Sequence, residues 1–161
     1  MKKVIVIGSP GAGKSTFSRK LRDKTNLPLY YLDMLWHKAD KTTVSQAEFD
    51  DRLCEILQQE QWIIDGNYSR TLEMRLQTCD TVFLLDFPVE VCLSGVESRI
   101  GKKRVDMPWI ETEFDEEFKQ WILDFPNIRL PQIYALLEKY KDDKEIIIFK
   151  SRKAADAYFE K

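Results

Sequence analysis

The sequence predicts a single α/β domain in which helices cover both faces of a parallel β-sheet. Four short runs are apolar along their whole length rather than alternating with polar residues, as expected for strands that are buried on both faces. These runs are Val4–Ile7, Trp62–Ile64, Val82–Leu85 and Ile146–Phe149. Helix-length amphipathic segments lie between them, and alternation of strand and helix is typical of doubly wound folds. The length of 161 residues fits one domain.

Local signals predict the remaining elements. We expect a fifth strand at Leu29–Leu32, and Ser45 with Glu48 matches the S-x-x-E capping box that begins a helix. Pro88 suits a first helical turn, where its missing N–H is not needed. Pro126 and Pro131 divide the region 112–140 and predict at least two helices there. The other expected helices are Ser15–Lys24, Ser45–Gln59, Arg70–Gln77, Val89–Ile100 and Ala154–Glu160.

Charge and composition exclude several classes of protein. Lys and Arg total 25 against 27 Asp and Glu, a formal net charge of −2, so no general field attracts nucleic acid or an anionic membrane. No apolar run approaches the roughly 18 residues of a transmembrane helix. The three cysteines are widely spaced and lack a C-x-x-C pair, which indicates reduced thiols. We expect a cytoplasmic protein with a local anion site, and neither direct nucleic-acid binding nor membrane association.

The most specific motif fits G-x-x-x-x-G-K-[ST] at every defined position, after a predicted strand and before a predicted helix. Its residues are Gly8, Ser9, Pro10, Gly11, Ala12, Gly13, Lys14 and Ser15. Backbone N–H groups of such a loop surround phosphate oxygens, and the helix N-terminus adds its positive dipole end. We expect this loop to bind ATP, with Lys14 on the β- and γ-phosphates, Ser15 on Mg²⁺ and Thr16 on the α-phosphate. The alternative is a glycine-rich turn that caps a helix and binds nothing.

Carboxylates end three of the predicted strands, at the sheet edge where ligands of parallel α/β folds bind. Asp33 follows Leu29–Leu32 and is expected to position or deprotonate an acceptor hydroxyl. Asp65 follows Trp62–Ile64 and is expected to organise Mg²⁺ together with Ser15. The alternative for both is a structural cap or turn. For Asp86 we expect only a turn.

Arginines are needed to offset the negative charge that the glycine-rich loop leaves unbalanced during phosphoryl transfer. Arg70, five residues after Asp65, could meet an acceptor anion, while Arg99 and Arg104 could close over the triphosphate from a lid. Arg129 is a further candidate. The other interpretation of this basic segment is a solvated face, which we favour for Lys102 and Lys103. His37, the only histidine, either faces the acceptor or packs beside its tryptophan neighbour.

Several segments together resemble one family. They read Y-Y-L-D-M-L-W-H at 30–37, W-I-I-D-G-N-Y-S-R at 62–70, V-F-L-L-D-F-P at 82–88 and I-I-I-F-K-S-R at 146–152. The chain is similar to the adenylate-kinase-like P-loop kinases, and within them to bacterial DNA topology modulation proteins of the FlaR type. This resemblance implies a three-layer P-loop NTPase fold whose five-stranded parallel sheet has the order 2-3-1-4-5. It also implies one domain over residues 1–161, like the nucleoside and nucleotide kinases, with an acceptor-side region at about 33–60 and a short lid at about 99–112.

The same resemblance implies where ligands bind. It places ATP on the loop around Gly13, the acceptor near Asp33, Trp36 and Arg70, and residues 150–152 near the nucleobase. Adenylate kinases read D-G-F-P-R where this chain has the longer Asp65–Arg70 segment, and alignment of the fourth strands puts Gly95 where they carry a phosphate-binding arginine. An acceptor other than AMP therefore fits better.

We expect a Mg²⁺-ATP-dependent kinase that phosphorylates a small hydroxyl compound, with nucleosides and nucleotides among the candidates. The residues expected to take part in catalysis are Lys14, Asp33, Arg70 and Arg99. Two alternatives stay open: a nucleotide-binding regulator without turnover, and a slow ATPase.

Overall fold

The computed structural model describes residues 1–161 and contains a sheet of five parallel strands in the order β2-β3-β1-β4-β5. The strands are β1 (Lys3–Gly8), β2 (Leu29–Tyr31), β3 (Trp62–Asp65), β4 (Thr81–Leu85) and β5 (Glu145–Phe149). In the register, Val6 lies beside Asp65 and Gly8 lies beside Leu85. The carboxyl ends of the central strands therefore share one edge of the sheet. The predicted fold class and strand order are confirmed.

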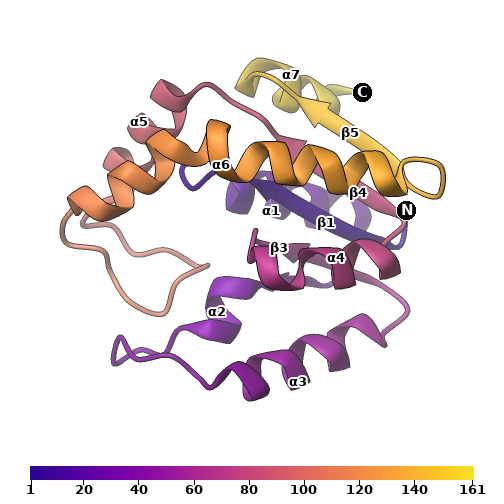
Figure 1. The fold of residues 1–161 in the computed structure, drawn as a ribbon, viewed down its shortest axis with the longest axis horizontal. Coiled ribbons are helices and arrows are strands. Elements are labelled where there is room, and N and C mark those ends of the chain that lie inside the picture. Colours follow the sequence, from indigo (N-terminus) through magenta and orange to yellow (C-terminus); the bar gives the residue numbers. More distant parts are fainter.

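Helices cover both faces of this sheet, which gives three layers (Figure 1). They are α1 (Lys14–Thr25), α2 (Leu32–Trp36), α3 (Gln46–Leu57), α4 (Ser69–Thr78), α5 (Val89–Arg99), α6 (Glu116–Tyr140) and α7 (Arg152–Ala157), followed by a 3₁₀ turn at Tyr158–Glu160. Helices α3, α4 and α6 share one hydrophobic cluster with the sheet, and α1, α5 and α7 share the other. No helix is both long and apolar enough to cross a membrane.

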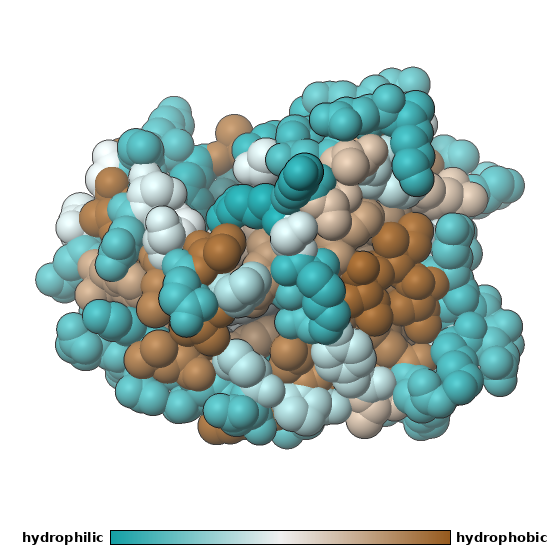
Figure 2. Space-filling view, turned by 90° about the horizontal axis from the view of Figure 1, so that it is seen from above, coloured by the Kyte–Doolittle hydropathy of each residue, from teal (hydrophilic) through white to brown (hydrophobic).

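The central strand shows why the apolar runs predicted strands correctly. Val4 and Val6 belong to the cluster on the α1 side, whereas Ile5 and Ile7 belong to the cluster on the α6 side, and all four are fully buried. A strand covered on both faces needs apolar side chains at consecutive positions, not at alternate ones. On the face seen from above, Figure 2 shows hydrophobic side chains in patches separated by hydrophilic ones.

Two predicted helix starts are confirmed. Ser45 precedes α3 and its hydroxyl accepts the Glu48 N–H at 3.1 Å, which satisfies one of the first-turn donors. Pro88 immediately precedes α5. The short helix α2, which begins at Leu32 directly after β2, was not predicted.

The expectation that Pro126 and Pro131 separate two helices is wrong, since both lie inside the continuous 25-residue helix α6. A proline in a helix interior costs about 3 kcal/mol because it removes a hydrogen bond and crowds the preceding turn. The apolar face of α6 offsets this cost: Ile122, Phe125 and Ile133 are buried, and each such side chain contributes about 1.5–3 kcal/mol.

Candidate active site

A cleft of about 1130 Å³ lies where the carboxyl ends of the strands meet the loops that follow them. Its walls come from the glycine-rich loop after β1, from α2 and the segment between α2 and α3, and from the segment between β3 and α4. The segment between α5 and α6, and α6 itself, complete them. In Figure 1 the α5–α6 segment and the segment between α2 and α3 lie on the same side of the molecule. The cleft exceeds the range of about 300–1,000 Å³ that is typical of one small ligand, so it can hold two.

The glycine-rich loop is pressed against α5. Gly11 and Gly13 have φ angles of 80° and 94°, in the left-handed region that favours glycine. A Cβ atom on Gly11 would lie 2.0 Å from the carbonyl oxygen of Cys92, and one on Gly95 would lie 2.1 Å from the carbonyl oxygen of Gly11. Glycine at 11 and 95 therefore allows the loop backbone to fold tightly against this helix.

The start of α1 is open to the cleft. No side chain caps α1 at Gly13, so the N–H groups of its first turn are left for a ligand. The Lys14 ammonium donates to the Ser9 carbonyl at 3.1 Å, and burial lowers the pKa of this lysine. Pro10, Gly11, Gly13, Lys14, Ser15 and Thr16 line the cleft, whereas Gly8, Ser9 and Ala12 form the buried back of the loop. This geometry suits an anion with several oxygens.

Asn67, which the sequence reasoning missed, ties this loop to β3. Its side-chain oxygen accepts the Gly8 N–H at 2.9 Å, and its amide nitrogen donates to the Gly8 carbonyl. The pair fixes the point at which the chain leaves β1. Its position directly after Asp65-Gly66 was the available signal, but the partner lies 59 residues away.

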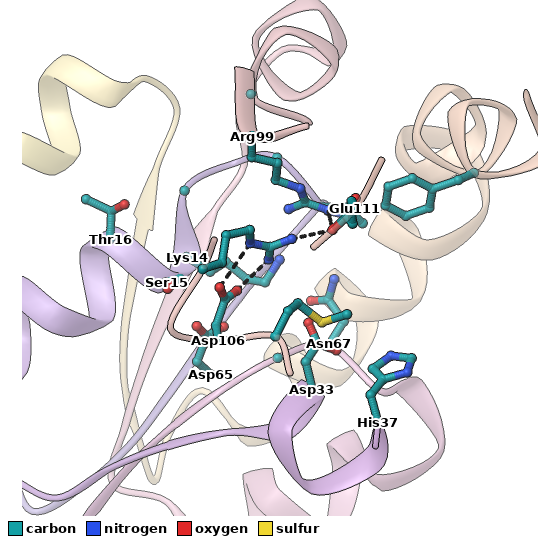
Figure 3. A pocket seen from close by; sticks show the side chains of 18 of the residues that line it. Lys14, Ser15, Thr16, Asp33, His37, Asp65, Asn67, Arg99, Asp106 and Glu111 are labelled. Carbon is teal, nitrogen blue, oxygen red and sulfur yellow. Dashed lines mark hydrogen bonds and ion pairs between the residues drawn. The ribbon is translucent and has the colours of Figure 1, made fainter. Parts of the chain in front are cut away.

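Asp65 ends β3 and is buried beside Lys14. Burial raises the pKa of its carboxyl to about 7, although the positive charge of Lys14 opposes this rise. Figure 3 shows Asp65 and Lys14 in one group with Ser15. A hydroxyl and a carboxylate are oxygen donors of the kind that Mg²⁺ prefers, so Ser15 and Asp65 fit this ion chemically.

A magnesium site here would depend on more than protein side chains. Nowhere in the chain do three or more His, Cys, Asp or Glu side chains group closely enough to hold a metal ion. Phosphate oxygens and water would have to complete the coordination, as is usual for Mg²⁺. The Arg19 guanidinium donates to Ser15 Oγ at 2.5 Å and to Thr16 Oγ1 at 3.3 Å, so it would have to move from Ser15.

Asp33 lies in the same cleft and is held by Tyr68. The Tyr68 hydroxyl donates to Asp33 Oδ1 at 2.6 Å, and burial together with this carboxylate raises the tyrosine pKa. Tyr68 has a φ angle of 38° and precedes α4. The carboxylate oxygen that Tyr68 does not engage is left for another donor, such as a hydroxyl group.

Arg75 holds the segment that carries Tyr68, and the sequence did not point to this role. It is fully buried, and its guanidinium donates to the carbonyls of Gly66 at 2.8 Å, Tyr68 at 3.2 Å and Asn67. Burial lowers its pKa to about 9. Because one guanidinium binds three carbonyl groups, it fixes the segment between β3 and α4. This segment carries Tyr68, the hydrogen-bond partner of Asp33.

Among three comparisons with known proteins, only the one with solved structures gives matches. No family model matches the chain, and no curated protein matches it. Solved structures do match. The chain shares its fold with shikimate kinases.

Two of these structures cover almost the whole chain. Shikimate kinase from Acinetobacter baumannii in complex with shikimate has a TM-score of 0.61 and 19% identity, over 99% of this chain and 90% of that one. Shikimate kinase from Bacteroides thetaiotaomicron has a TM-score of 0.56 and 18% identity, over 98% and 93%. The likeness is one of fold, namely the P-loop NTPase arrangement with the strand order described above.

Ion pairs hold the expected lid segment, residues 99–112, in place. Arg104 pairs with Asp106 at 2.6 Å and also with Glu111, while Arg99 lies 3.3 Å from Glu111. All four side chains line the cleft, and Figure 3 shows Arg99, Asp106 and Glu111 around Lys14. Two acidic groups therefore already balance the two lid arginines.

The lid also meets the acceptor side through Trp109. The His37 ring packs edge-on against Trp109 with centroids 5.9 Å apart, and Lys41 Nζ lies 5.5 Å from the centre of the indole. All three residues line the cleft. His37 therefore faces the cleft and packs on Trp109. Its sequence neighbour Trp36 packs on Phe49 and does not line the cleft.

Arg70 is not where the sequence reasoning expected it. Its guanidinium pairs with Asp50 on α3 at 2.6 Å. Arg70 is exposed, Asp50 is half-buried, and Arg70 does not line the cleft. The reason is that α4 turns Leu72 and Leu76 inward and Arg70 toward α3. Arg129 on α6 lines the cleft instead, and its guanidinium stacks 4.0 Å above the Trp121 ring.

Asp86 does more than form a turn. Its carboxylate accepts from the Tyr134 hydroxyl at 2.6 Å and from Lys150 Nζ at 2.5 Å. This group joins the ends of β4 and β5 to α6. Lys150 is therefore engaged away from the cleft, which it does not line.

Proposed function

We propose that the chain is a Mg²⁺- and ATP-dependent kinase that transfers the γ-phosphate to a hydroxyl group of a small acceptor. One observation carries this proposal: Lys14, Asp65 and Asp33 line a single cleft. A phosphate-binding lysine, a carboxylate suited to a metal and a second carboxylate held by Tyr68 are the parts that phosphoryl transfer needs. The shared fold with shikimate kinases supports it.

Each residue has a role in this proposal. The loop amides and Lys14 would hold the phosphates and stabilise charge on the transferring group. Ser15 and Asp65 would hold Mg²⁺, which would neutralise the charge that develops on the phosphate groups. Asp33 would orient the acceptor hydroxyl and accept its proton as the oxygen bonds to phosphorus. Arg99 and Arg104 would contact the triphosphate once Asp106 and Glu111 release them.

The acceptor in this proposal carries an anionic group as well as a hydroxyl. The cleft is also lined by Lys41 and Arg129, and neither forms an ion pair with a carboxylate. Unpaired cations facing a cleft favour a carboxylate or phosphate ligand. Shikimate, the ligand of one structural neighbour, is a hydroxylated carboxylate and is the first compound to test. Nucleotides provide the phosphate alternative.

The proposal extends to the whole chain. Residues 1–161 form one catalytic domain with an acceptor-side region at about 33–60 and a lid at about 99–112. The similarity to FlaR-type topology modulation proteins and the cytoplasmic location remain predictions. A net charge of −2 favours a small-molecule acceptor over direct binding of nucleic acid.

The test measures ADP release from Mg²⁺-ATP with and without each acceptor. The panel contains shikimate, nucleosides and nucleoside monophosphates, and Lys14→Ala serves as the inactive control. Acceptor-dependent ADP release supports a kinase. Release that is equal without acceptor would indicate a slow ATPase, and ATP binding without any release would indicate a non-catalytic regulator.

A further inference from the structure

Arg152, the first residue of α7, reaches across to the glycine-rich loop. Its Nη2 donates to the Gly11 carbonyl at 3.0 Å, although the two residues are 141 positions apart in the chain. Arg152 lines the same cleft as Lys14. The sequence resemblance implied only that residues 150–152 lie near a nucleobase, so a side chain lying against the phosphate-binding loop is a different observation.

Two glycines leave space for this guanidinium. A Cβ atom on Gly13 would lie 3.0 Å from Arg152 Nη1, and one on Gly95 would lie 3.1 Å from Arg152 Nη2. Gly95 is inside α5, where glycine weakens a helix relative to alanine. Without a side chain, Gly95 leaves room for both the backbone of the glycine-rich loop and the Arg152 side chain. The guanidinium therefore lies in a notch between Gly13 and Gly95.

The residues on either side of Arg152 hold the start of α7 in place. Lys150 is bound to Asp86, and the Ser151 hydroxyl accepts the Ala154 N–H at 3.1 Å and caps α7. The carboxylate of Asp156 on the same helix pairs with Lys20. Arg152 itself forms no ion pair with a carboxylate.

Most hydrogen-bonding capacity of this guanidinium is unused. An arginine side chain has five N–H donors. In Arg152 only one of them, on Nη2, has a protein acceptor, which is the Gly11 carbonyl. The unused donors belong to a planar fork that matches two oxygens of a phosphate group. Its neighbours Gly11 and Gly13 belong to the loop whose N–H groups are expected to surround phosphate oxygens.

We infer that Arg152 is a nucleotide-binding residue whose guanidinium contacts the α- and β-phosphates of a nucleotide held by the glycine-rich loop. This inference rests on the nucleotide site of the proposed function but not on transfer to an acceptor. ATP and ADP both carry these two phosphates, and adenosine carries neither. Arg152 therefore contributes equally to ATP and ADP affinity and nothing to adenosine affinity.

The experiment is calorimetric titration of ATP, ADP and adenosine, without acceptor, into the wild-type chain, Arg152→Ala and Arg152→Lys. We expect Arg152→Ala to weaken ATP and ADP binding by about tenfold or more, with adenosine unchanged. Arg152→Lys retains the charge but not the fork, so its affinities should be intermediate. The matched control is Lys153→Ala, because Lys153 is exposed on the same helix and does not line the cleft. Circular dichroism checks that each variant is folded.

Each outcome separates the possibilities. Unchanged ATP and ADP affinity in folded Arg152→Ala would overturn the inference, as would an equal loss for adenosine, which would indicate a contact to the base. Failure of the wild-type chain to bind ATP would overturn both the inference and the proposed function. Weaker ATP and ADP binding in Arg152→Ala, together with no phosphorylated acceptor from the wild type, would support the inference and contradict the proposed function.

Discussion

The Tyr68 hydroxyl donates a hydrogen bond to the Asp33 carboxylate at 2.6 Å, which joins the first turn of α2 to the segment that precedes α4. If Asp33 orients the acceptor and takes its proton, Asp33→Asn should lower kcat by about 100-fold or more while ATP affinity changes little. Tyr68→Phe keeps the ring and removes the donor, so kcat should fall by about threefold to tenfold. Steady-state kinetics and ATP titration measure both. Equal loss of kcat and ATP affinity in Asp33→Asn would contradict the role of Asp33.

Arg129 and Arg70 make opposite predictions. Arg129 stacks on Trp121 inside the cleft, whereas Arg70 pairs with Asp50 outside it. Arg129→Ala should raise KM for an anionic acceptor by about tenfold or more, because a charge-assisted contact is lost. Arg70→Ala is the matched control and should change KM by less than about twofold, since exposed ion pairs contribute little. The reverse order of effects would restore Arg70 to the acceptor site.

The buried Asp65 carboxyl gives the protein a defined pH dependence. Its pKa is about 7 in the fold and 3.8 as the ordinary reference value, so the folded chain binds more protons between these pH values. Stability from this group is therefore fully present below about pH 4 and is lost as the pH rises through 7.

Asp65→Asn removes this titration. Thermal unfolding of the nucleotide-free wild type and variant between pH 4 and 8 should show the variant gaining relative stability as the pH rises, on the order of a few kcal/mol. A difference in Tm that stays constant across this range would show that Asp65 does not titrate there.

Arg75 stabilises the segment between β3 and α4 through the carbonyls of Gly66, Asn67 and Tyr68. Arg75→Met fills similar space but leaves these buried acceptors without a donor, so the free energy of unfolding should fall by about 3 kcal/mol or more. Urea denaturation of the wild type, Arg75→Met and Arg75→Lys measures this, with the lysine variant less affected because it retains a charged donor. A loss below about 0.5 kcal/mol in Arg75→Met would show that the segment is held by other contacts.

Sequence reasoning predicted the fold well because its signals are local. Consecutive apolar residues such as Val4–Ile7 indicate a doubly covered strand, and Ser45 with Glu48 indicates a helix start, without knowledge of the rest of the chain. The continuity of α6 was missed because packing of Phe125 and Ile133 on the sheet, a tertiary effect, offsets the cost of its prolines.

Parts of the candidate site could not be found this way. Asn67 bonds to Gly8, and Arg152 to Gly11, across separations of 59 and 141 residues that leave no trace in local patterns. Arg70 was misplaced because its partner Asp50 lies on another helix. The cleft carboxylates Asp33 and Asp65 were identified because strand ends of a parallel sheet converge at one edge.

Phosphorylation of an acceptor by the wild-type chain tests the proposed kinase activity most directly. Phosphorus NMR of the protein with Mg²⁺-ATP and shikimate, and in parallel with nucleosides and nucleoside monophosphates, distinguishes a phosphate ester from free phosphate. The arrangement of Lys14, Asp33 and Asp65 predicts one phosphorylated acceptor for each ADP formed, with none in Lys14→Ala. Free phosphate as the only product at a rate that no acceptor changes, or no ADP from a chain that binds ATP, would contradict it.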